Sequence, residues 1–220
     1  MFRKLVNVGI SMVVVFVLGA CASQQSLPPS AGYGSLTTSP ETYEYLIGPG
    51  DQVQIFVWRN PEVSQTVTVR PDGKITTPLV EDLQASGKTP NQLARDLEKA
   101  LETYIRQPIV TVIVAGGIGP YSEQIRVVGQ LAGSSGSQQG GQVASARAIA
   151  YRRQMTLLDV LIEIGGLNEF AAGNRTRLVR MVDGEQKEYV VRLRDLLNGD
   201  ISANVDMLPG DILIIPESWF

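Results

Sequence analysis

Residues 46–58 read LIGPGDQVQIFVW, and this stretch contains the pattern on which the fold prediction depends. Pro49 fixes its own φ, Gly50 tolerates a positive φ, and Asp51 can accept hydrogen bonds from nearby backbone, so the sequence predicts a tight turn. Residues 52–58 alternate between polar and apolar at first and then run apolar, which predicts a strand. The stretch therefore predicts a turn that leads directly into a β-strand.

The same turn pattern is repeated near the end of the sequence. Residues 209–215 read PGDILII, so a Pro-Gly-Asp turn again precedes an apolar strand. Two ordinary turns are a sufficient physical explanation for this echo. A third turn signal, at residues 71–73, predicts a hairpin. The residues expected to act as structural turns are Gly48, Pro49, Gly50 and Asp51, then Pro71, Asp72 and Gly73, and finally Pro209, Gly210 and Asp211.

The best helix signal in the sequence begins at Thr89. Thr89 is a candidate N-cap, Pro90 suits the first helical position, and Gln92 completes a capping box. Helical spacing then predicts one apolar face, formed by Leu93, Leu97, Ala100, Leu101 and Tyr104.

Strands are predicted on both sides of this helix. Residues 66–70 and 74–77 flank the hairpin turn before it. Residues 109–115 (IVTVIVA) follow it and are apolar on both faces, which predicts a central strand. Residues 43–115 are therefore expected to form an α+β domain with the order β-β-β-α-β.

Residues 116–122 are expected to be a Gly-rich linker between two domains. A Gly-rich loop after a strand also suggests phosphate binding. No Lys-Ser or Lys-Thr follows here, however, and Pro120 stands where a helix should open. The linker interpretation is therefore preferred.

Residues 123–217 are expected to form a second domain. It contains predicted strands at its beginning and end, a helix that begins after Thr156 with Asp159 in a capping box, and a hairpin around Asp183-Gly184. Residues 131–147 are rich in Gly, Ser, Gln and Ala, and this composition predicts a disordered insertion. The predicted elements are strands at 124–129, 148–152, 177–182, 186–192 and 212–215, a helix ending at Gly165-Gly166, and a helical turn at 193–197.

The N-terminal sequence is typical of an export signal. Two basic residues precede an apolar run, and small residues follow it, which predicts a signal peptide over residues 1–20. Leu18-Gly19-Ala20-Cys21 looks like the lipobox of bacterial lipoproteins, so Cys21 is the expected lipidation site. An uncleaved N-terminal anchor and an incidental cysteine are the alternatives. Residues 21–42 are rich in Ser, Pro and Gly and predict a flexible tether.

Composition excludes several classes of function. The chain has 220 residues with 19 basic and 22 acidic side chains, no histidine and one cysteine. A net charge of −3 argues against a nucleic-acid binder, and the lack of histidine excludes Ser-His-Asp and Cys-His catalysis. Glu62, Glu81 and Asp82 are expected to be solvated charges rather than a glycosidase pair. We therefore expect no catalytic residue, no metal site and no cofactor.

Several of the sequence motifs described above, taken in their order and spacing, resemble those of a known family. Residues 45–51, 70–75, the helix after Thr89 and the 109–115 strand resemble the N-terminal domain of bacterial polysaccharide export (OPX) outer-membrane lipoproteins. The second block resembles a small ligand-binding beta-grasp (SLBB) domain, through Arg126-Val127-Val128-Gly129, residues 155–160, Gly165-Gly166-Leu167 and residues 208–216. Residues 56–63 and 75–83 look closest to exopolysaccharide export proteins associated with exosortase/PEP-CTERM systems.

This resemblance implies a fold and a function. The fold is α+β, with a polysaccharide export domain followed by an SLBB domain. The implied protein is lipid-anchored in the outer membrane, faces the periplasm, and forms a homo-oligomeric ring that guides an exopolysaccharide or capsular polysaccharide. The implied partners are the sugar chain, an inner-membrane polysaccharide co-polymerase and, because no long amphipathic stretch follows the last strand, a separate outer-membrane β-barrel.

Two other functions remain open at this stage. The first is a lipid-tethered beta-grasp module that binds polysaccharide or a partner without conducting it. The second is a hydrolase or lyase that acts on the polysaccharide. We expect Trp58 to lie in the core, and we expect the aromatic end at residues 218–220 to pack on the closing strand, with a docking tag as the alternative.

Overall fold

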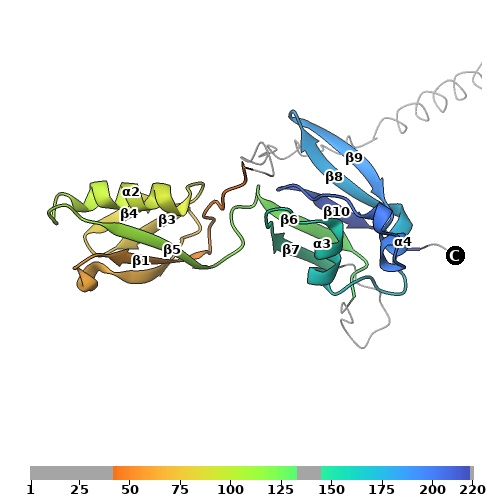
Figure 1. Ribbon diagram of the computed structural model, residues 1–220, viewed down its shortest axis with the longest axis horizontal. Helices are drawn as coiled ribbons and strands as arrows, with labels where there is room; N and C mark the ends of the chain where they lie inside the picture. The colour runs from red at the N-terminus through yellow and green to blue at the C-terminus, as the bar shows by residue number, and fades with distance from the viewer. Residues whose placement is uncertain (1–41, 133–144, 219–220) are drawn as a thin grey trace, which may run out of the picture. The chain divides into compact units, whose positions relative to one another are not determined.

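The computed structural model describes residues 42–132 and 145–218 (Figure 1). Two hydrophobic cores are present, and each is built on its own sheet. We refer to residues 45–116 as the first domain and to residues 123–217 as the second domain. Both combine strands with helices, which confirms the expected α+β class.

The first domain contains a three-stranded sheet, a separate hairpin and one long helix. The sheet has the order β2-β1-β5 and is antiparallel throughout. Strands β3 and β4 pair only with each other. The elements are β1 (Gln52–Val57), η2 (Pro61–Val63), β2 (Gln65–Thr68), β3 (Lys74–Thr77), β4 (Val80–Gln84), α2 (Pro90–Leu101) and β5 (Val110–Gly116).

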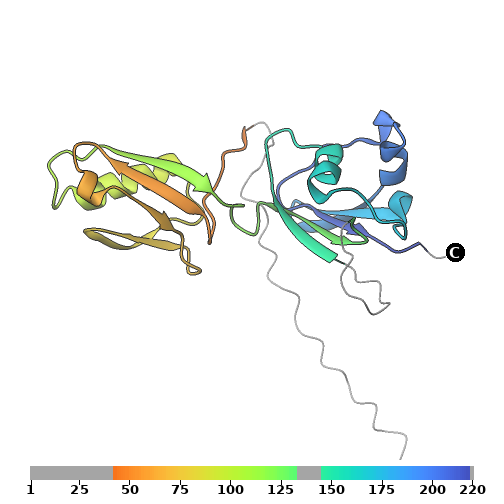
Figure 2. The ribbon, with the colours of Figure 1, turned by 90° about the horizontal axis from the view of Figure 1, so that it is seen from below.

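The helix α2 forms where its capping residues predict. The Thr89 side chain accepts a hydrogen bond from the backbone N–H of Gln92 at 3.2 Å, and the Gln92 side chain accepts one from the backbone N–H of Thr89 at 2.9 Å. Leu93, Leu97 and Leu101 are buried, so this face of the helix packs on the core. Figures 1 and 2 show α2 along one face of the sheet strands.

Four expectations for the first domain are wrong. Tyr104 is 62% exposed, because the helix ends before it, at Leu101. Strand β5 is an edge strand rather than a central one. Strand β3 pairs with β4, a strand that the sequence did not predict, instead of with β2. Trp58 is 54% exposed instead of buried, because alternation places it with Phe56 on the face that α2 does not cover.

The second domain contains a five-stranded mixed sheet with the order β7-β6-β10-β8-β9. Strand β10 lies in the middle and is parallel to β6 and antiparallel to β8. The elements are β6 (Gln124–Gly129), β7 (Ser145–Ala150), α3 (Leu157–Ile164), η3 (Gly173–Arg175), β8 (Thr176–Val182), β9 (Glu185–Val191), α4 (Leu193–Leu197), η4 (Ile201–Ala203) and β10 (Ile212–Ile215).

The helix α3 and the β8–β9 hairpin follow their sequence signals. The Asp159 carboxylate accepts a hydrogen bond from the backbone N–H of Thr156 at 2.8 Å and so closes the first turn. Gly165 ends the helix with a φ of 83°. Asp183 and Gly184 both have positive φ, 54° and 81°, which is the conformation of a two-residue hairpin turn.

The insertion predicted at residues 131–147 is shorter than expected at its far end. Strand β7 begins at Ser145 and pairs with β6 along its whole length, so residues 145–147 belong to the sheet. Residues 133–144 lie outside the described residues. The predicted signal peptide, Cys21 and most of the tether also lie outside them, as do Trp219 and Phe220. Within the described ranges, no helix is long and apolar enough to span a membrane.

Candidate functional site: two aspartate-closed turns

The first Pro-Gly-Asp turn closes through both the backbone and the side chain of Asp51. Gly50 has a φ of 89°, which is the left-handed conformation that the turn requires. The Asp51 N–H donates to the Gly48 carbonyl at 3.2 Å, and the Gly48 N–H donates back to Asp51 Oδ2 at 2.8 Å. The side chain thus duplicates the backbone closure of the turn.

The Asp51 carboxylate also joins this turn to two other segments. It is buried, with 1% of the residue exposed. Its Oδ2 accepts from the Tyr45 hydroxyl at 2.5 Å, and its Oδ1 accepts from the backbone N–H groups of Ile118 and Gly119 at 3.1 and 3.3 Å. Burial of a carboxylate is tolerated when its oxygens are hydrogen-bonded in this way. One side chain therefore holds together the entry to β1 and the linker after β5.

The glycines of the linker are required by this close approach. A Cβ added to Gly48 would lie 2.1 Å from the carbonyl carbon of Gly119, and one added to Gly117 would lie 1.9 Å from Asp51 Oδ1. Gly117 also has a φ of 143°. The Gly-rich character of this linker therefore reflects backbone packing around a carboxylate, not a phosphate-binding loop.

The second Pro-Gly-Asp turn repeats this geometry with a different partner. Gly210 has a φ of 85°, the Asp211 N–H donates to the Leu208 carbonyl at 3.2 Å, and the Leu208 N–H donates to Asp211 Oδ2 at 2.7 Å. Asp211 is fully buried. Arg180 of β8 donates through Nε to Oδ1 at 2.8 Å and through Nη2 to Oδ2 at 2.7 Å, which is a bidentate ion pair.

Both turns occupy the same topological position. The first leads into β1, the middle strand of the three-stranded sheet, and the second leads into β10, the middle strand of the five-stranded sheet. Neither is a hairpin turn. In both domains, therefore, the Pro-Gly-Asp turn fixes the start of a central strand.

The third predicted turn has a weaker role. Gly73 has a φ of 80° and donates its N–H to the Arg70 carbonyl at 2.8 Å. Arg70 pairs with Asp72 at 2.7 Å and with Asp82, and all three side chains are about half exposed. Solvated pairs of this kind contribute about 0–1 kcal/mol.

The three acidic residues considered for a glycosidase pair are solvated charges, as expected. Glu62, Glu81 and Asp82 are all exposed. A hydrogen bond from Asn60 lowers the pKa of Glu62, which favours the charged form over a proton-donating one. Asp82 is paired with Arg70. In residues 42–132 and 145–218, no cluster of three potential metal ligands is found.

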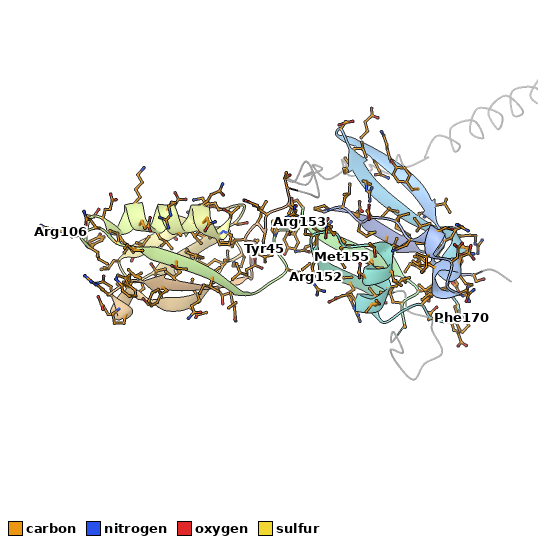
Figure 3. All side chains as sticks on the ribbon, in the orientation of Figure 1. Tyr45, Arg106, Arg152, Arg153, Met155 and Phe170 are labelled. Carbon is orange, nitrogen blue, oxygen red and sulfur yellow. The ribbon has the colours of Figure 1, made fainter. Side chains whose placement is uncertain are left out.

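Sequence reasoning missed the residues that complete the two turns. The sequence shows Tyr45 only as part of a motif that resembles a family, and no local pattern distinguishes Arg180. In the structure, the Tyr45 hydroxyl (labelled in Figure 3) donates a hydrogen bond to buried Asp51, and the Arg180 guanidinium pairs with buried Asp211. An acidic residue directly before an apolar strand was the available signal, because such a residue requires a partner once it is buried.

Substitution of the turn glycines tests the backbone geometry. We expect Gly50→Val and Gly210→Val each to lower the free energy of unfolding by about 1–3 kcal/mol, because a β-branched residue is strained at positive φ. No atom lies within 4 Å of a Cβ at Gly50, so the loss there would be conformational strain and not a clash. Urea unfolding measures the effect. Gly116→Ala, also in open space, is the control, and equal stability of all variants would contradict the turn geometry.

The Tyr45 hydroxyl makes stability sensitive to high pH. Burial and the hydrogen bond to Asp51 raise the pKa of Tyr45 above its ordinary value of 10.0. The folded protein therefore holds the phenolic proton more tightly than the unfolded chain. This contribution to stability is complete below about pH 10 and declines as pH rises above it.

We expect Tyr45→Phe to cost about 1–3 kcal/mol at pH 8, through the lost bond to a carboxylate, and less at pH 11. Urea unfolding at the two pH values measures this difference. An equal loss at both would show that the hydroxyl is not buried against Asp51.

Comparison with known proteins places the two domains. A family model described as "Polysaccharide biosynthesis/export protein" matches residues 39–115, and an SLBB domain model matches residues 140–215. The chain is thus a two-domain protein with an export domain followed by an SLBB domain, as expected. Its first domain is thus similar to the polysaccharide biosynthesis/export family and its second domain to the SLBB family.

Two curated relatives have the same printed name, EPS I polysaccharide export outer membrane protein EpsA. The one from Ralstonia nicotianae is 26% identical over 198 residues, covering 79% of this chain and 47% of the relative. The one from Ralstonia solanacearum is 27% identical over 193 residues, covering 77% and 47%. The chain spans about half the length of these relatives. The matched family and both relatives are named for polysaccharide export, which agrees with the sequence-based expectation of a transport component rather than an enzyme.

Proposed function

We propose that this protein is a non-catalytic component of an exopolysaccharide or capsular polysaccharide export system. The observation that carries the proposal is the succession of an export domain and an SLBB domain, matched by two family models in that order. Both relatives are named as polysaccharide export proteins of the outer membrane. The geometry of the two turns agrees with a structural role, because the buried carboxylates of Asp51 and Asp211 close turns and fix the starts of strands.

The proposed location is the periplasmic side of the outer membrane. Support comes from the export signal over residues 1–20, from the lipobox-like sequence before Cys21, and from the names of the relatives, which place them in the outer membrane. Several acyl chains on one cysteine would give stable membrane attachment. The polar tether at residues 21–42 would let the folded domains stand away from the lipid surface.

The proposed assembly is a homo-oligomeric ring through which the sugar chain passes. An inner-membrane polysaccharide co-polymerase would deliver the chain, and a separate outer-membrane β-barrel would complete the path. This part of the proposal, like the link to exosortase/PEP-CTERM systems, rests on the family resemblance of the sequence. Sizing and electron microscopy of the detergent-extracted, lipidated protein test the ring directly, and a monomer would favour a binding module that does not conduct.

Deletion of the gene tests the export role. We expect the deletion strain to lose surface polysaccharide and a plasmid copy of the gene to restore it. A deletion strain with normal surface polysaccharide would remove the assignment. Because the proposed role needs no chemistry on the sugar, the purified mature chain should release no reducing sugar from the polysaccharide.

Replacement of Cys21 tests the lipid anchor. We expect Cys21→Ser to accumulate as an unprocessed precursor and to incorporate no labelled fatty acid, because the chain has no other thiol. Ser23→Ala, two residues further on, is the matched control and should be processed normally. Normal acylation of the Cys21→Ser variant would sink the lipoprotein assignment.

A further inference from the structure

One face of the three-stranded sheet is uncovered in the first domain. Helix α2 packs on the face that carries the buried residues of β1 and β5, and the alternate residues of the same strands point the other way and are exposed. In Figure 2 the ribbons of β1 and β5 are seen with α2 behind them. We call this uncovered surface the open face. Its exposed residues are Gln52, Gln54, Phe56, Trp58, Thr66, Thr68, Ile109, Thr111, Ile113 and Ala115.

The open face carries no charged residue. Charged residues are exposed elsewhere in the domain. Helix α2 and its C-terminal end present Arg95, Lys99 and Glu102 to solvent, and the β3–β4 hairpin presents Glu81 and Asp82. Contiguous exposed apolar surface commonly marks an interaction site, and this face combines exposed aromatic and aliphatic side chains with no charge across three strands.

Two exposed aromatic rings lie on the open face. Phe56 is 44% exposed and Trp58 is 54% exposed. Their ring centroids are 6.4 Å apart in an edge-to-face arrangement, which presents aromatic surface to solvent. The backbone N–H of Trp58 donates to the Ile109 carbonyl at 2.9 Å, so the ladder with the neighbouring strand continues to this point and fixes the backbone that carries the Trp58 ring.

The rest of the open face offers hydrogen-bonding groups without charge. Glutamine amides lie on β1, and threonine hydroxyls lie on the strands either side of it; the register places Gln54 beside Thr66 and Phe56 beside Thr111. Within the described ranges, none of the open-face amides and hydroxyls makes a side-chain hydrogen bond. Their donors and acceptors are therefore available to a ligand.

A neutral sugar chain has the chemistry that matches this surface. Each sugar ring has apolar C–H faces, which stack on aromatic rings, and hydroxyl edges, which bond to amides and hydroxyls. A second copy of the domain that docked through α2 or the β3–β4 hairpin would set charged side chains against the open face, and buried unpaired charges are costly.

We propose that the open face contacts the exported polysaccharide, and that it fits a neutral, hydroxyl-rich chain. This inference rests on the proposed export function and adds to it the contact surface and the charge class of the sugar. The contact is made by the aromatic pair and the neighbouring amide and hydroxyl side chains.

Photo-crosslinking in cells that produce the polysaccharide tests the contact surface. Benzoyl-phenylalanine replaces Phe56 in the full-length protein, and Tyr189 of β9 is the matched control because it is also 44% exposed. We expect a carbohydrate-staining, high-mass adduct from position 56 that is absent from position 189 and from cells that make no polysaccharide. An adduct with a second copy or another protein, or no carbohydrate adduct at position 56, would overturn the proposal.

A fluorescence titration tests the charge class. The sequence has two tryptophans, so Trp219→Phe leaves Trp58 as the only indole in the mature chain. We expect dextran, a neutral glucan, to change the Trp58 emission at sugar concentrations at least tenfold below those needed with alginate, an acidic chain. Equal or stronger responses to alginate, or none to dextran, would contradict a neutral-chain surface.

A charge placed on the open face separates this inference from the proposed function. We expect Gln54→Glu to reduce surface polysaccharide severalfold without lowering the melting temperature, and Gln186→Glu, an equally conservative change on an exposed strand, to have no effect. If deletion abolishes export while Gln54→Glu exports normally and position 56 captures no sugar, the export function stands and the contact surface is wrong.

Discussion

Asp211→Ala should lower the free energy of unfolding by about 3 kcal/mol, which is enough to unfold a large fraction of a marginally stable domain. The variant leaves the Arg180 guanidinium without the carboxylate to which it donates at 2.7 and 2.8 Å, in a position where only 20% of its side chain is exposed. It also removes the acceptor of the Leu208 N–H. The estimate takes the lower end of the range for a broken buried pair because Arg180 retains some contact with water.

The position of this pair explains why its loss should spread through the domain. Asp211 directly precedes β10, and its carbonyl accepts from the Arg126 N–H of the neighbouring strand at 3.0 Å. Urea unfolding followed by far-UV circular dichroism measures the effect. Glu188→Ala is the control. Glu188 of β9 pairs with Arg177, which lies on β8 like Arg180, but this pair is 3.6 Å apart and both side chains are nearly half exposed. Similar losses in the two variants would contradict a special role for Asp211.

Asp51→Ala should have the second-largest effect, also about 3 kcal/mol. Hydrogen bonds to a charged group contribute about 1.5–3 kcal/mol each, but the four bonds to Asp51 share one acceptor group and will not add. The Tyr45 hydroxyl can turn to water. The Gly48, Ile118 and Gly119 N–H groups lose their acceptor and stay beside the gap.

Amide hydrogen exchange gives the local test of this prediction. We expect Asp51→Ala to accelerate exchange of the Ile118 and Gly119 amides by at least tenfold more than it accelerates exchange within β10. Asp72→Ala is the matched control, because Asp72 belongs to a turn of similar sequence whose side chains are exposed. Unchanged protection at the linker in the Asp51→Ala variant would show that the carboxylate does not hold it.

Local sequence signals predicted the local structure well. The capping box at Thr89, the stop at Gly165 and the Asp183-Gly184 turn depend on neighbouring residues, and all three are present. The Pro-Gly-Asp sequence predicted the turn because a turn is set by a few neighbouring residues, and Gly50 has the positive φ that it requires.

Long-range contacts explain what the sequence could not show. Extension of the β8–β10 register places Arg180 directly opposite Asp211, 31 residues away, and no local pattern encodes that pairing. Asp51 finds its linker donors 67 and 68 residues away.

The error at Trp58 has the same origin. An apolar residue on a strand predicts burial, but whether a face is covered depends on where the helix packs. In this domain α2 covers one face, and Phe56 and Trp58 lie on the other. The candidate surface for the sugar is therefore formed by apolar residues that their hydrophobicity alone would place in the core.

The most direct test of the export assignment is the location of newly made polysaccharide in the deletion strain. Radiolabelled sugar precursor is supplied, and polymer is measured separately at the cell surface, in the periplasm and in the membrane fraction, with the complemented strain as the reference. Export without a role in synthesis predicts that surface polymer falls to background while polymer or its lipid-linked intermediates persist inside the cell envelope. Surface polymer at the level of the complemented strain, or no polymer in any fraction, would contradict the assignment.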